Sequence, residues 1–328
     1  MSSMRNLARQ LNMTYPIIQA GMAGGITTPD LVAAVSEGGG LGTIGAGYLS
    51  PTQLKQAIEQ VRAKTKKPFG VNLFVPHDYT VQPDSIRHMN EYLNRYRREL
   101  GMDAVSSLPT EYAPDFDEQF DVILAEHIPI FSFTFGLLAK EQIAKLHAIG
   151  TFVIGTATSV GEAMALEQLG VDAIVAQGSE AGGHRGGFEG QNSGFLVGTM
   201  ALVPQIADNV SIPVIASGGI MDGRGLAAAM ALGAAAVQMG TAFLTCPEAG
   251  TNPSYRQALL NHTEEDTRIT TAYSGKPARG IETSFVKEMD QYVGSIPDYP
   301  VQNALTRDIR QAESLLSCKL ATNDGETT

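Results

Sequence analysis

The stretch VDAIVAQGSEAGGHRG, residues Val171 to Gly186, joins a short apolar run to a glycine-rich loop that contains one histidine. Val171–Ala176 has the length and composition of a buried strand, so Gln177–Gly186 forms the loop at its carboxyl end. Glycine allows φ > 0 and close approach of a ligand to the main chain, and histidine titrates near neutral pH. The stretch therefore predicts that His184 serves proton transfer at a strand end, although a tight turn with an exposed histidine would have a similar composition.

The same alternation of an apolar run and a helical pattern extends outward from this strand in both directions. One helical pattern, for example, has apolar residues at Leu54, Ile58 and Val61. About eight strands, each followed by a helix, predict an α/β fold, a closed (β/α)8 barrel of the triosephosphate isomerase (TIM) type. The other predicted strands are Pro16–Ala20, Gly42–Gly45, Phe69–Phe74, Ile128–Thr134, Thr151–Ile154, Pro213–Ser217 and Ala234–Gln238.

A doubly wound open sheet is the competing architecture, because it also alternates strands and helices. Such a sheet often carries the dinucleotide fingerprint GxGxxG, and Gly40–Gly45 (GLGTIG) matches that pattern. The match lies before and within the second predicted strand, whereas the fingerprint belongs between the first strand and its helix. We interpret the match as accidental and favour the barrel.

Segments that break the alternation predict additions to the barrel. His77–Pro114 is rich in charge and tyrosine and has a helical centre at Ser85–Leu100, which is typical of an inserted segment or lid. The predicted parts are a barrel over residues 1–246 with an insertion at 77–115, a smaller cap on the substrate side at 247–293, a segment at 294–320 that returns to the barrel and ends in a helix at Ile309–Leu320, and a disordered polar tail at 321–328.

The composition is that of a globular protein with a large core, because 43% of the 328 residues are hydrophobic and 17% are charged. A formal net charge of −11 without a long basic run argues against a general nucleic-acid binder. The two isolated cysteines, Cys246 and Cys318, make neither a disulfide framework nor a zinc site. Met1–Tyr15 lacks an apolar signal region, and no later apolar run could cross a bilayer. We therefore predict a soluble, cytoplasmic protein without a metal, a nucleic-acid partner or a membrane partner.

Polar residues interrupt several predicted strands near their carboxyl ends, where barrel enzymes place their active sites. Buried amides and hydroxyls need partners, so a set that converges on one barrel mouth indicates a polar ligand with many hydrogen-bonding atoms. Each amide taken alone could instead bind the main chain of its own loop. The residues concerned are Gln19, Asn72, Ser132, Thr134, Gln177, Ser217 and Gln238.

Glycine-containing turns after the last two predicted strands indicate a phosphate site. Ser217–Gly223 (SGGIMDG) follows the seventh strand, and Gln238–Thr241 (QMGT) ends the eighth. Loops in these places commonly hold phosphate through main-chain N–H groups and a helix N-terminus. The chain has no GxxxxGKS/T loop, so an NTPase of that class is not expected.

Six short motifs form a specific set. They are Gln19–Gly25 (QAGMAGG), Phe69–Phe74 (FGVNLF), the loop Gln177–Gly186, Ala216–Gly219 (ASGG), Gln238–Thr241 and Lys276–Gly280 (KPARG). From Tyr15 to Arg279 the chain resembles the FMN-dependent nitronate monooxygenases, formerly called 2-nitropropane dioxygenases. One residue departs from the family pattern, which often has proline where this chain has Gly21, and the difference bears on the rigidity of that loop.

The resemblance implies a flavin-dependent oxidoreductase with non-covalently bound FMN and His184 as the catalytic residue. His184 would either deprotonate a neutral nitroalkane or, when protonated, stabilise the anionic nitronate. In the family an alkyl nitronate gives an electron to the flavin, O2 takes part, the products are a carbonyl compound and nitrite, and no nicotinamide is required. The implied FMN residues are the main chain of Met22, Ala23 and Gly24 near the ring, the amides of Asn72 and Gln177, and Gly182, Gly183, Ser217, Gly218, Gly219, Gln238, Met239, Gly240 and Thr241 around the phosphate.

Two other functions stay open. The flavin-dependent enoyl-acyl-carrier-protein reductases have a similar barrel and glycine–histidine loop and use NAD(P)H, although Val71–Phe74, the insertion and Asn192–Gly194 look closer to the nitronate enzymes. A non-redox barrel that binds a phosphate-containing ligand belongs to a different class. Glu180 could pair with Arg185 or position His184, and a solvated loop charge is the simpler expectation. Expected partners are a small nitronate or nitroalkane and O2, with a homodimer as a possible assembly.

Overall fold

The computed structural model describes residues 7–106, 108–188 and 196–312. The chain forms two compact units, which we name the barrel unit (Met1–His77 and Pro114–Gly250) and the second unit (Asp78–Ala113 and Thr251–Thr328). Each unit has a hydrophobic core of its own. The roles assigned above to the insertion and the cap stay predictions.

The barrel unit contains a parallel sheet that closes on itself. Within the described residues the sheet has eight strands in the order β1-β9-β8-β6-β5-β4-β3-β2. Its two ends meet where Ile18 of β1 bridges Leu41, just before β2. The predicted (β/α)8 barrel is therefore confirmed. Its strands are β1 (Ile17–Gln19), β2 (Thr43–Gly45), β3 (Gly70–Phe74), β4 (Ile130–Thr134), β5 (Phe152–Ala157), β6 (Ala173–Gln177), β8 (Val214–Ser217) and β9 (Ala236–Met239), and the short β7 (Gly183–His184) lies outside this sheet.

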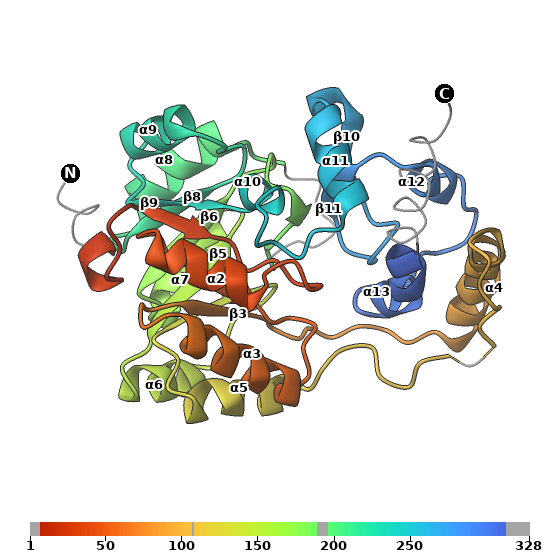
Figure 1. Cartoon of the computed structure of the whole chain (residues 1–328), viewed down its shortest axis with the longest axis horizontal. Helices are drawn as coiled ribbons and strands as arrows, with labels where there is room; N and C mark the ends of the chain where they lie inside the picture. Colours follow the sequence, from red (N-terminus) through yellow and green to blue (C-terminus); the bar gives the residue numbers. More distant parts are fainter. Residues whose placement is uncertain (1–6, 107, 189–195, 313–328) are drawn as a thin grey trace, which may run out of the picture. The chain divides into compact units, whose positions relative to one another are not determined.

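Helices alternate with these strands and surround the sheet (Figure 1). Thr28 caps α2 by accepting from Leu31 N at 3.1 Å, and Ser50 and Gln53 form a capping box at the start of α3. None of the helices in the described ranges is long and apolar enough to cross a membrane. The helices of the barrel unit are α2 (Pro29–Glu37), α3 (Pro51–Lys64), α5 (Phe116–Ala125), α6 (Lys140–Ala148), α7 (Val160–Leu169), α8 (Thr199–Asn209), α9 (Gly223–Ala231) and α10 (Thr241–Leu244).

The fifth strand is longer than the sequence predicted. β5 runs to Ala157, beyond the predicted end at Ile154, and the added residues continue the parallel ladder with β6. In the sequence, Gly155 predicts the start of a loop after Ile154. A Cβ at this position would lie 2.5 Å from Leu166 Cδ2, so the glycine instead allows α7 to pack closely on the strand.

Side chains of the barrel strands alternate between two cores. Along β4, Phe131 and Phe133 belong to the core between the sheet and the helices, whereas Ile130 belongs to the core inside the barrel. Ser132 and Thr134 lie on the same face of β4 as Ile130, because strand side chains alternate with a period of two. The barrel interior is therefore apolar at the amino ends of the strands and becomes polar toward their carboxyl ends.

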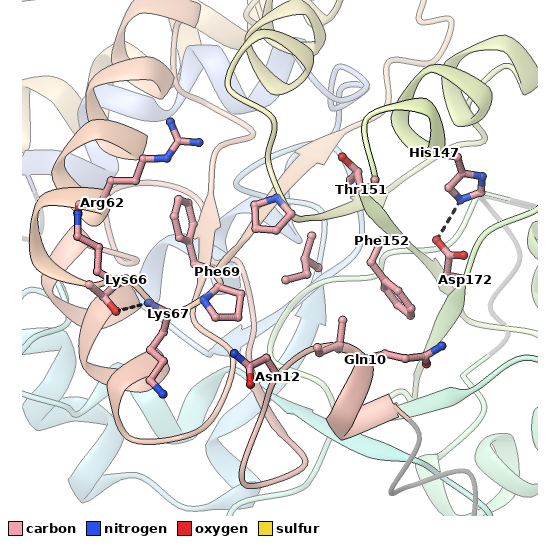
Figure 2. A pocket seen from close by; sticks show the side chains of 16 residues that line it. Gln10, Asn12, Arg62, Lys66, Lys67, Phe69, His147, Thr151, Phe152 and Asp172 are labelled. Atoms are coloured by element: carbon pink, nitrogen blue, oxygen red, sulfur yellow. Dashed lines mark hydrogen bonds and ion pairs between the residues drawn. The ribbon is translucent and has the colours of Figure 1, made fainter.

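The segment before β1 closes the amino end of the barrel. Leu7, Leu11 and Met13 are buried and belong to the core inside the barrel. The sequence marked this segment only as polar, yet its few apolar side chains supply part of the barrel floor. A cavity of about 1020 Å³ lies at the same end, and Gln10 and Asn12 contribute to its lining (Figure 2).

Gln19 joins the two ends of the sheet. Its side-chain oxygen accepts from Thr43 N at 3.0 Å, and its side-chain nitrogen donates to Thr43 O at 3.2 Å. The residue is fully buried. This strand-end amide therefore satisfies the main chain of β2 where β1 and β2 share few ladder bonds, which is the alternative that the sequence left open for any single amide.

The second unit combines the segment inserted into the barrel sequence with the C-terminal part of the chain. Its core includes Met89 from α4, Phe285 from α12 and Val301 from α13. Arg97 is buried beside this core, and its guanidinium donates to Asp308 at 2.7 Å, so the buried charge is paired. The elements are α4 (Pro83–Glu99), α11 (Pro253–Asn261), the 3-10 helix η1 (Glu264–Asp266), β10 (Thr267–Thr270), β11 (Ala278–Ile281), α12 (Ser284–Met289) and α13 (Val301–Leu305).

α4 confirms the helix predicted at Ser85–Leu100. Other predictions fall partly or wholly outside the described residues. Only residues 309–312 of the predicted helix Ile309–Leu320 are described, and these are helical. The predicted tail at 321–328 and the motif Asn192–Gly194 lie outside the described residues.

Candidate active site at the carboxyl ends of the barrel strands

All of the residues that the sequence marked as site residues belong to the barrel unit and lie at the carboxyl ends of strands or in the loops that follow. Because the strands are parallel and the sheet is closed, these ends meet at one mouth of the barrel. Met22, Ala23 and Gly24 follow β1; Asn72 lies in β3; Gln177 ends β6, before Gly182, Gly183 and His184; Ser217 ends β8, before Gly218 and Gly219; Gln238 and Met239 end β9, before Gly240 and Thr241.

The cavity shown in Figure 2 lies at the opposite end of the barrel. The side chains that line it include Arg62, which pairs with Glu126, and His147, whose Nε2 lies 3.0 Å from a carboxylate oxygen of Asp172. Lys66 donates to the main-chain oxygen of Arg62 at 3.3 Å. The side chains of Arg62, His147 and Lys66 thus have partners within the protein. In barrel enzymes, residues at the amino ends of the strands contribute to stability. We therefore place the candidate site at the carboxyl ends.

The loop after β1 is fixed in place against β2. Thr27 Oγ1 donates to Met22 O at 3.0 Å and accepts from Gly45 N at 2.7 Å. A Cβ at Gly45 would lie 2.3 Å from the Met22 carbonyl carbon, so only glycine allows this approach. A Cβ at Gly21 would lie 2.6 Å from Asn72 Cβ. The loop that has glycine in place of the family's frequent proline is thus held by packing and by the Thr27 hydroxyl.

The Gln177 side chain holds the loop that carries His184. Its nitrogen donates to His184 O at 3.0 Å, and its oxygen accepts from Gly186 N at 2.7 Å. One amide therefore fixes the main chain on both sides of residue 185. The resemblance to the family implies that this amide contacts the cofactor, and within the described residues its hydrogen bonds position the histidine loop.

Arg185 is a buried residue of this loop that the sequence did not indicate as a site residue. Its Nη1 donates to Gly178 O at 2.6 Å and to Gln177 O at 3.2 Å. A guanidinium is rarely buried without such partners. The bonds tie the residue after His184 back to the end of β6, and an arginine in a glycine-rich loop gives no sequence signal for this role.

Two carboxylates fix the flanks of the same loop. Glu180 accepts from Thr199 N at 2.9 Å and so caps α8, which has no capping side chain at its own N-cap position. Glu180 is exposed, as expected of a solvated loop charge, and it also has this specific partner in α8. Glu162 is buried and accepts from Phe188 N at 2.5 Å and from Thr158 N at 2.6 Å.

The Glu162 contact could have been indicated only in part by the sequence. Ser159 and Glu162 form an S-x-x-E pattern, which marks a helix start. Nothing in the pattern indicates that the carboxylate holds the loop at Phe188.

Among the described residues, no group of three or more His, Cys, Asp and Glu side chains is arranged to hold a metal ion.

The turn after β8 has the conformation that its glycines permit, with φ of 110° at Gly218 and 69° at Gly219. The next helix, α9, is capped by Asp222, which accepts from Arg224 N at 2.9 Å. The hydrogen bond from the Arg224 guanidinium, followed by those from main-chain N–H groups, lowers the pKa of Asp222 to about 2. The first N–H groups of α9 therefore have a carboxylate of the protein as their partner.

The other predicted anion-binding turn, after β9, has no such carboxylate cap. α10 begins at Thr241, and no side chain of the described residues caps it. A Cβ at Gly182 would lie 2.8 Å from Thr241 Oγ1, so the histidine loop and this turn adjoin. The structure thus brings together two segments that the sequence assigned to the same phosphate.

The polar layer of the barrel mouth is only partly satisfied by the protein. Asn72 Nδ2 donates to Ser132 Oγ at 2.9 Å. Thr134 Oγ1 is buried and has no hydrogen-bond partner within the described part of the chain. An unsatisfied buried hydroxyl costs about 1–3 kcal/mol, so a polar ligand at this mouth would gain a partner that is already in place.

Comparison with known proteins places the chain in a family. A family described as nitronate monooxygenase matches residues 5–323. A probable nitronate monooxygenase of Staphylococcus aureus (strain Newman) is 52% identical over 314 residues, which cover 95% of this chain and 88% of the relative. A probable nitronate monooxygenase of Staphylococcus saprophyticus is 51% identical over 303 residues, 92% of this chain and 85% of the relative.

Solved structures agree with this relationship. The crystal structure of nitroalkane oxidase from Streptomyces ansochromogenes has a TM-score of 0.87 and 37% identity, with coverage of 95% of this chain and 88% of that chain. FabK from Thermotoga maritima has a TM-score of 0.68 and 31% identity, with coverage of 97% of both chains. By its sequence, its barrel and its relatives, this chain belongs to the nitronate monooxygenase family of flavin-dependent oxidoreductases.

Proposed function

We propose that this protein is an FMN-dependent nitronate monooxygenase, which oxidises alkyl nitronates with O2 to carbonyl compounds and nitrite. The observation that carries the proposal is the Gln177 amide, which holds the main chain on both sides of Arg185 and thereby fixes His184 at the barrel mouth. A histidine held there in a flavin-dependent family suits proton transfer to or from a small substrate.

The residues at the mouth fit FMN. Thr27 holds the Met22 carbonyl group, and the main chain of Met22, Ala23 and Gly24 would offer a flat ring a surface of main-chain atoms. The unpartnered Thr134 hydroxyl offers a polar contact. When bound, FMN would supply the ring that accepts electrons from the nitronate. The main-chain groups of Gly182, Gly183, Gly218, Gly219, Gly240 and Thr241, together with the side chains of Asn72, Ser217 and Gln238 and with Met239, would hold the rest of the cofactor.

His184 would act on the substrate proton or charge. As a neutral base it would remove the α-proton of a nitroalkane, and as an imidazolium it would stabilise the negative oxygens of a nitronate. Arg185 binds Gly178 O and Gln177 O, so it positions the loop. The small-molecule partners that follow from this role are a nitronate or nitroalkane and O2.

The test measures O2 uptake and nitrite release by the purified yellow protein with an alkyl nitronate and no nicotinamide. We expect the protein to consume O2 and to release nitrite. We expect His184→Asn to retain its flavin while kcat falls by about 100-fold or more, the usual contribution of a general acid or base. An unchanged rate in His184→Asn would reject the histidine assignment.

The same experiment separates the alternatives. A yellow protein that is inactive with nitronates but is bleached by NADH or NADPH would be the enoyl-acyl-carrier-protein reductase. A colourless protein without flavin absorption would be a non-redox barrel. Either result would overturn the proposed function.

A further inference from the structure

Phe135, the residue directly after β4, contacts the proposed catalytic histidine. Its ring centroid lies 5.6 Å from that of the His184 imidazole, and the two planes make an angle of 79°. Phe135 is 2% exposed. The contact is the edge-to-face arrangement that aromatic pairs prefer, so it favours one orientation of the imidazole over others.

The main chain of Phe135 is held in an unusual conformation at this place. Its φ is +77°, in the left-handed region that a bulky side chain rarely adopts. Its N–H donates to Gly186 O at 3.0 Å, in the histidine loop. Strained residues of this kind persist where the surrounding structure fixes them, and they cluster at functional sites. Phe135 is thus joined to the loop by both its main chain and its ring.

A second aromatic residue supports the Phe135 ring from the neighbouring strand. The Phe74 ring in β3 lies 4.6 Å from the Phe135 ring, at 36°, and Tyr48 lies 5.4 Å from Phe74 at 74°. The three rings form a row that ends at His184. A row of packed rings leaves Phe135 little freedom to move away from the imidazole.

We propose that Phe135 is a positioning residue, whose ring sets the orientation of the His184 imidazole. The χ2 torsion of histidine has broad minima, so the bonds of Gln177 to the loop main chain cannot orient the ring by themselves. The Phe135 ring supplies that restraint, and its left-handed main chain places it. The inference rests on the proposed function, because it assigns Phe135 a role through His184.

The first test replaces the ring and keeps an apolar side chain, with Phe135→Leu and Phe135→Met. We expect kcat to fall by about 10- to 100-fold, the cost of a misplaced reacting group, while KM and flavin content change little. Phe131→Leu is the matched control. Phe131 is a fully buried phenylalanine of β4, the strand that Phe135 follows, and it packs toward the helices. Its replacement is expected to lower stability without lowering kcat of the folded enzyme.

A double-mutant cycle tests whether Phe135 acts through His184. If it does, Phe135→Leu lowers kcat in the wild type and has no further effect in His184→Asn. An equal loss in both backgrounds would overturn the proposal and place Phe135 in contact with substrate or cofactor. A His184→Asn variant with full activity would instead reject the proposed function, so the two failures are distinguishable.

A spectroscopic readout separates positioning from loss of folding. The ring ¹⁵N signals of His184 are identified by their absence in His184→Asn. We expect them to shift or broaden in Phe135→Leu and to stay in place in Phe131→Leu. Unchanged signals in Phe135→Leu would overturn the proposal, and Phe135→Tyr, which keeps the ring, is expected to restore both signal position and kcat.

Discussion

At the residue scale, Gln177 shows how one side chain connects a strand to the site. Its amide nitrogen donates to His184 O at 3.0 Å, and its amide oxygen accepts from Gly186 N at 2.7 Å. Because His184 O and Gly186 N are main-chain groups, the Gln177 side chain holds the loop independently of the side chains in the loop. The main chain of His184 is therefore fixed relative to β6, which lowers the cost of reaching a reactive geometry.

Gln177→Leu keeps the shape of the side chain and removes both bonds. We expect the free energy of unfolding to fall by roughly 1–3 kcal/mol, because two main-chain groups lose their partners. Turnover should fall as well, since the loop is no longer held. Urea unfolding and steady-state assays would measure the two effects.

Gln205→Leu is the control for this change. Gln205 lies on the exposed face of α8, and among the described residues its side chain binds only Ala201 O of the same helix, so we expect an effect within about 0.5 kcal/mol. A Gln177 variant that behaves like the Gln205 variant would show that the two loop bonds are dispensable.

At the element scale, the two helices next to the site begin in different ways. α8 is capped from a distance by Glu180, and α9 is capped by its own Asp222. Both caps are carboxylates, which favour the positive end of a helix dipole. Each cap therefore anchors a site loop, at Gly178–Ser179 or at Gly218–Gly219, to the start of a helix.

The pKa of Asp222 predicts a pH-dependent contribution of α9 to stability. The folded protein lowers this pKa from 3.8 to about 2, chiefly through the Arg224 guanidinium and then through main-chain N–H groups. A carboxyl whose folded pKa is lowered stabilises the fold above its unfolded pKa, and this stability is lost as the pH falls through the folded pKa. The contribution is therefore present at pH 6 and disappears between about pH 4 and pH 2.

Asp222→Ala should lower the Tm at pH 6, and its difference from the wild type should shrink as the pH approaches 2. Thermal unfolding at both pH values would measure it. Arg224→Ala is the companion variant: the Arg224 side chain is 93% exposed, so its ion pair is screened by water and the variant should lose less than Asp222→Ala. A Tm difference for Asp222→Ala that is equal at both pH values would contradict the role of the ionised cap.

At the scale of the whole molecule, the two ends of the barrel unit differ in role: the amino end contributes to stability, and the carboxyl end carries the candidate site. The amino end is closed by the apolar side chains of Leu7, Leu11 and Met13, and the carboxyl end carries the candidate site. Leu11 is 1% exposed and belongs to the core inside the barrel. A defect at the amino end should therefore change stability and leave the rate of the folded enzyme unchanged.

Leu11→Ala tests this division. We expect the free energy of unfolding to fall by about 2–5 kcal/mol, as for other buried leucines, with kcat per bound flavin unchanged. Met164→Ala on α7, where the residue is 40% exposed, is the control and should be close to neutral. A large fall in kcat per flavin for Leu11→Ala would show that the two ends are coupled.

Much of the barrel could be predicted because each strand is recognisable from its local sequence. Strands that are buried on both faces need nearly continuous apolar runs, as in Ala173–Gln177, and the helices between them begin at caps such as Ser50. The local sequence did not predict the carboxyl end of β5. β5 continues past Gly155 because β6 pairs with it and α7 packs on it, and neither partner is visible in the local sequence.

The sequence by itself determined the eight-stranded barrel, the family and the loop that carries His184, because each depends on short runs of neighbouring residues. Only the tertiary structure decided that Gln19 closes the sheet, that Glu180 caps α8 and that Phe135 meets His184. In each case the partner lies 19 or more residues away along the chain, and the tertiary fold brings the two together. A hydrogen bond or ring contact depends on the distance between two residues in space. The separation of two residues in the sequence predicts that distance only within a single strand, turn or helix.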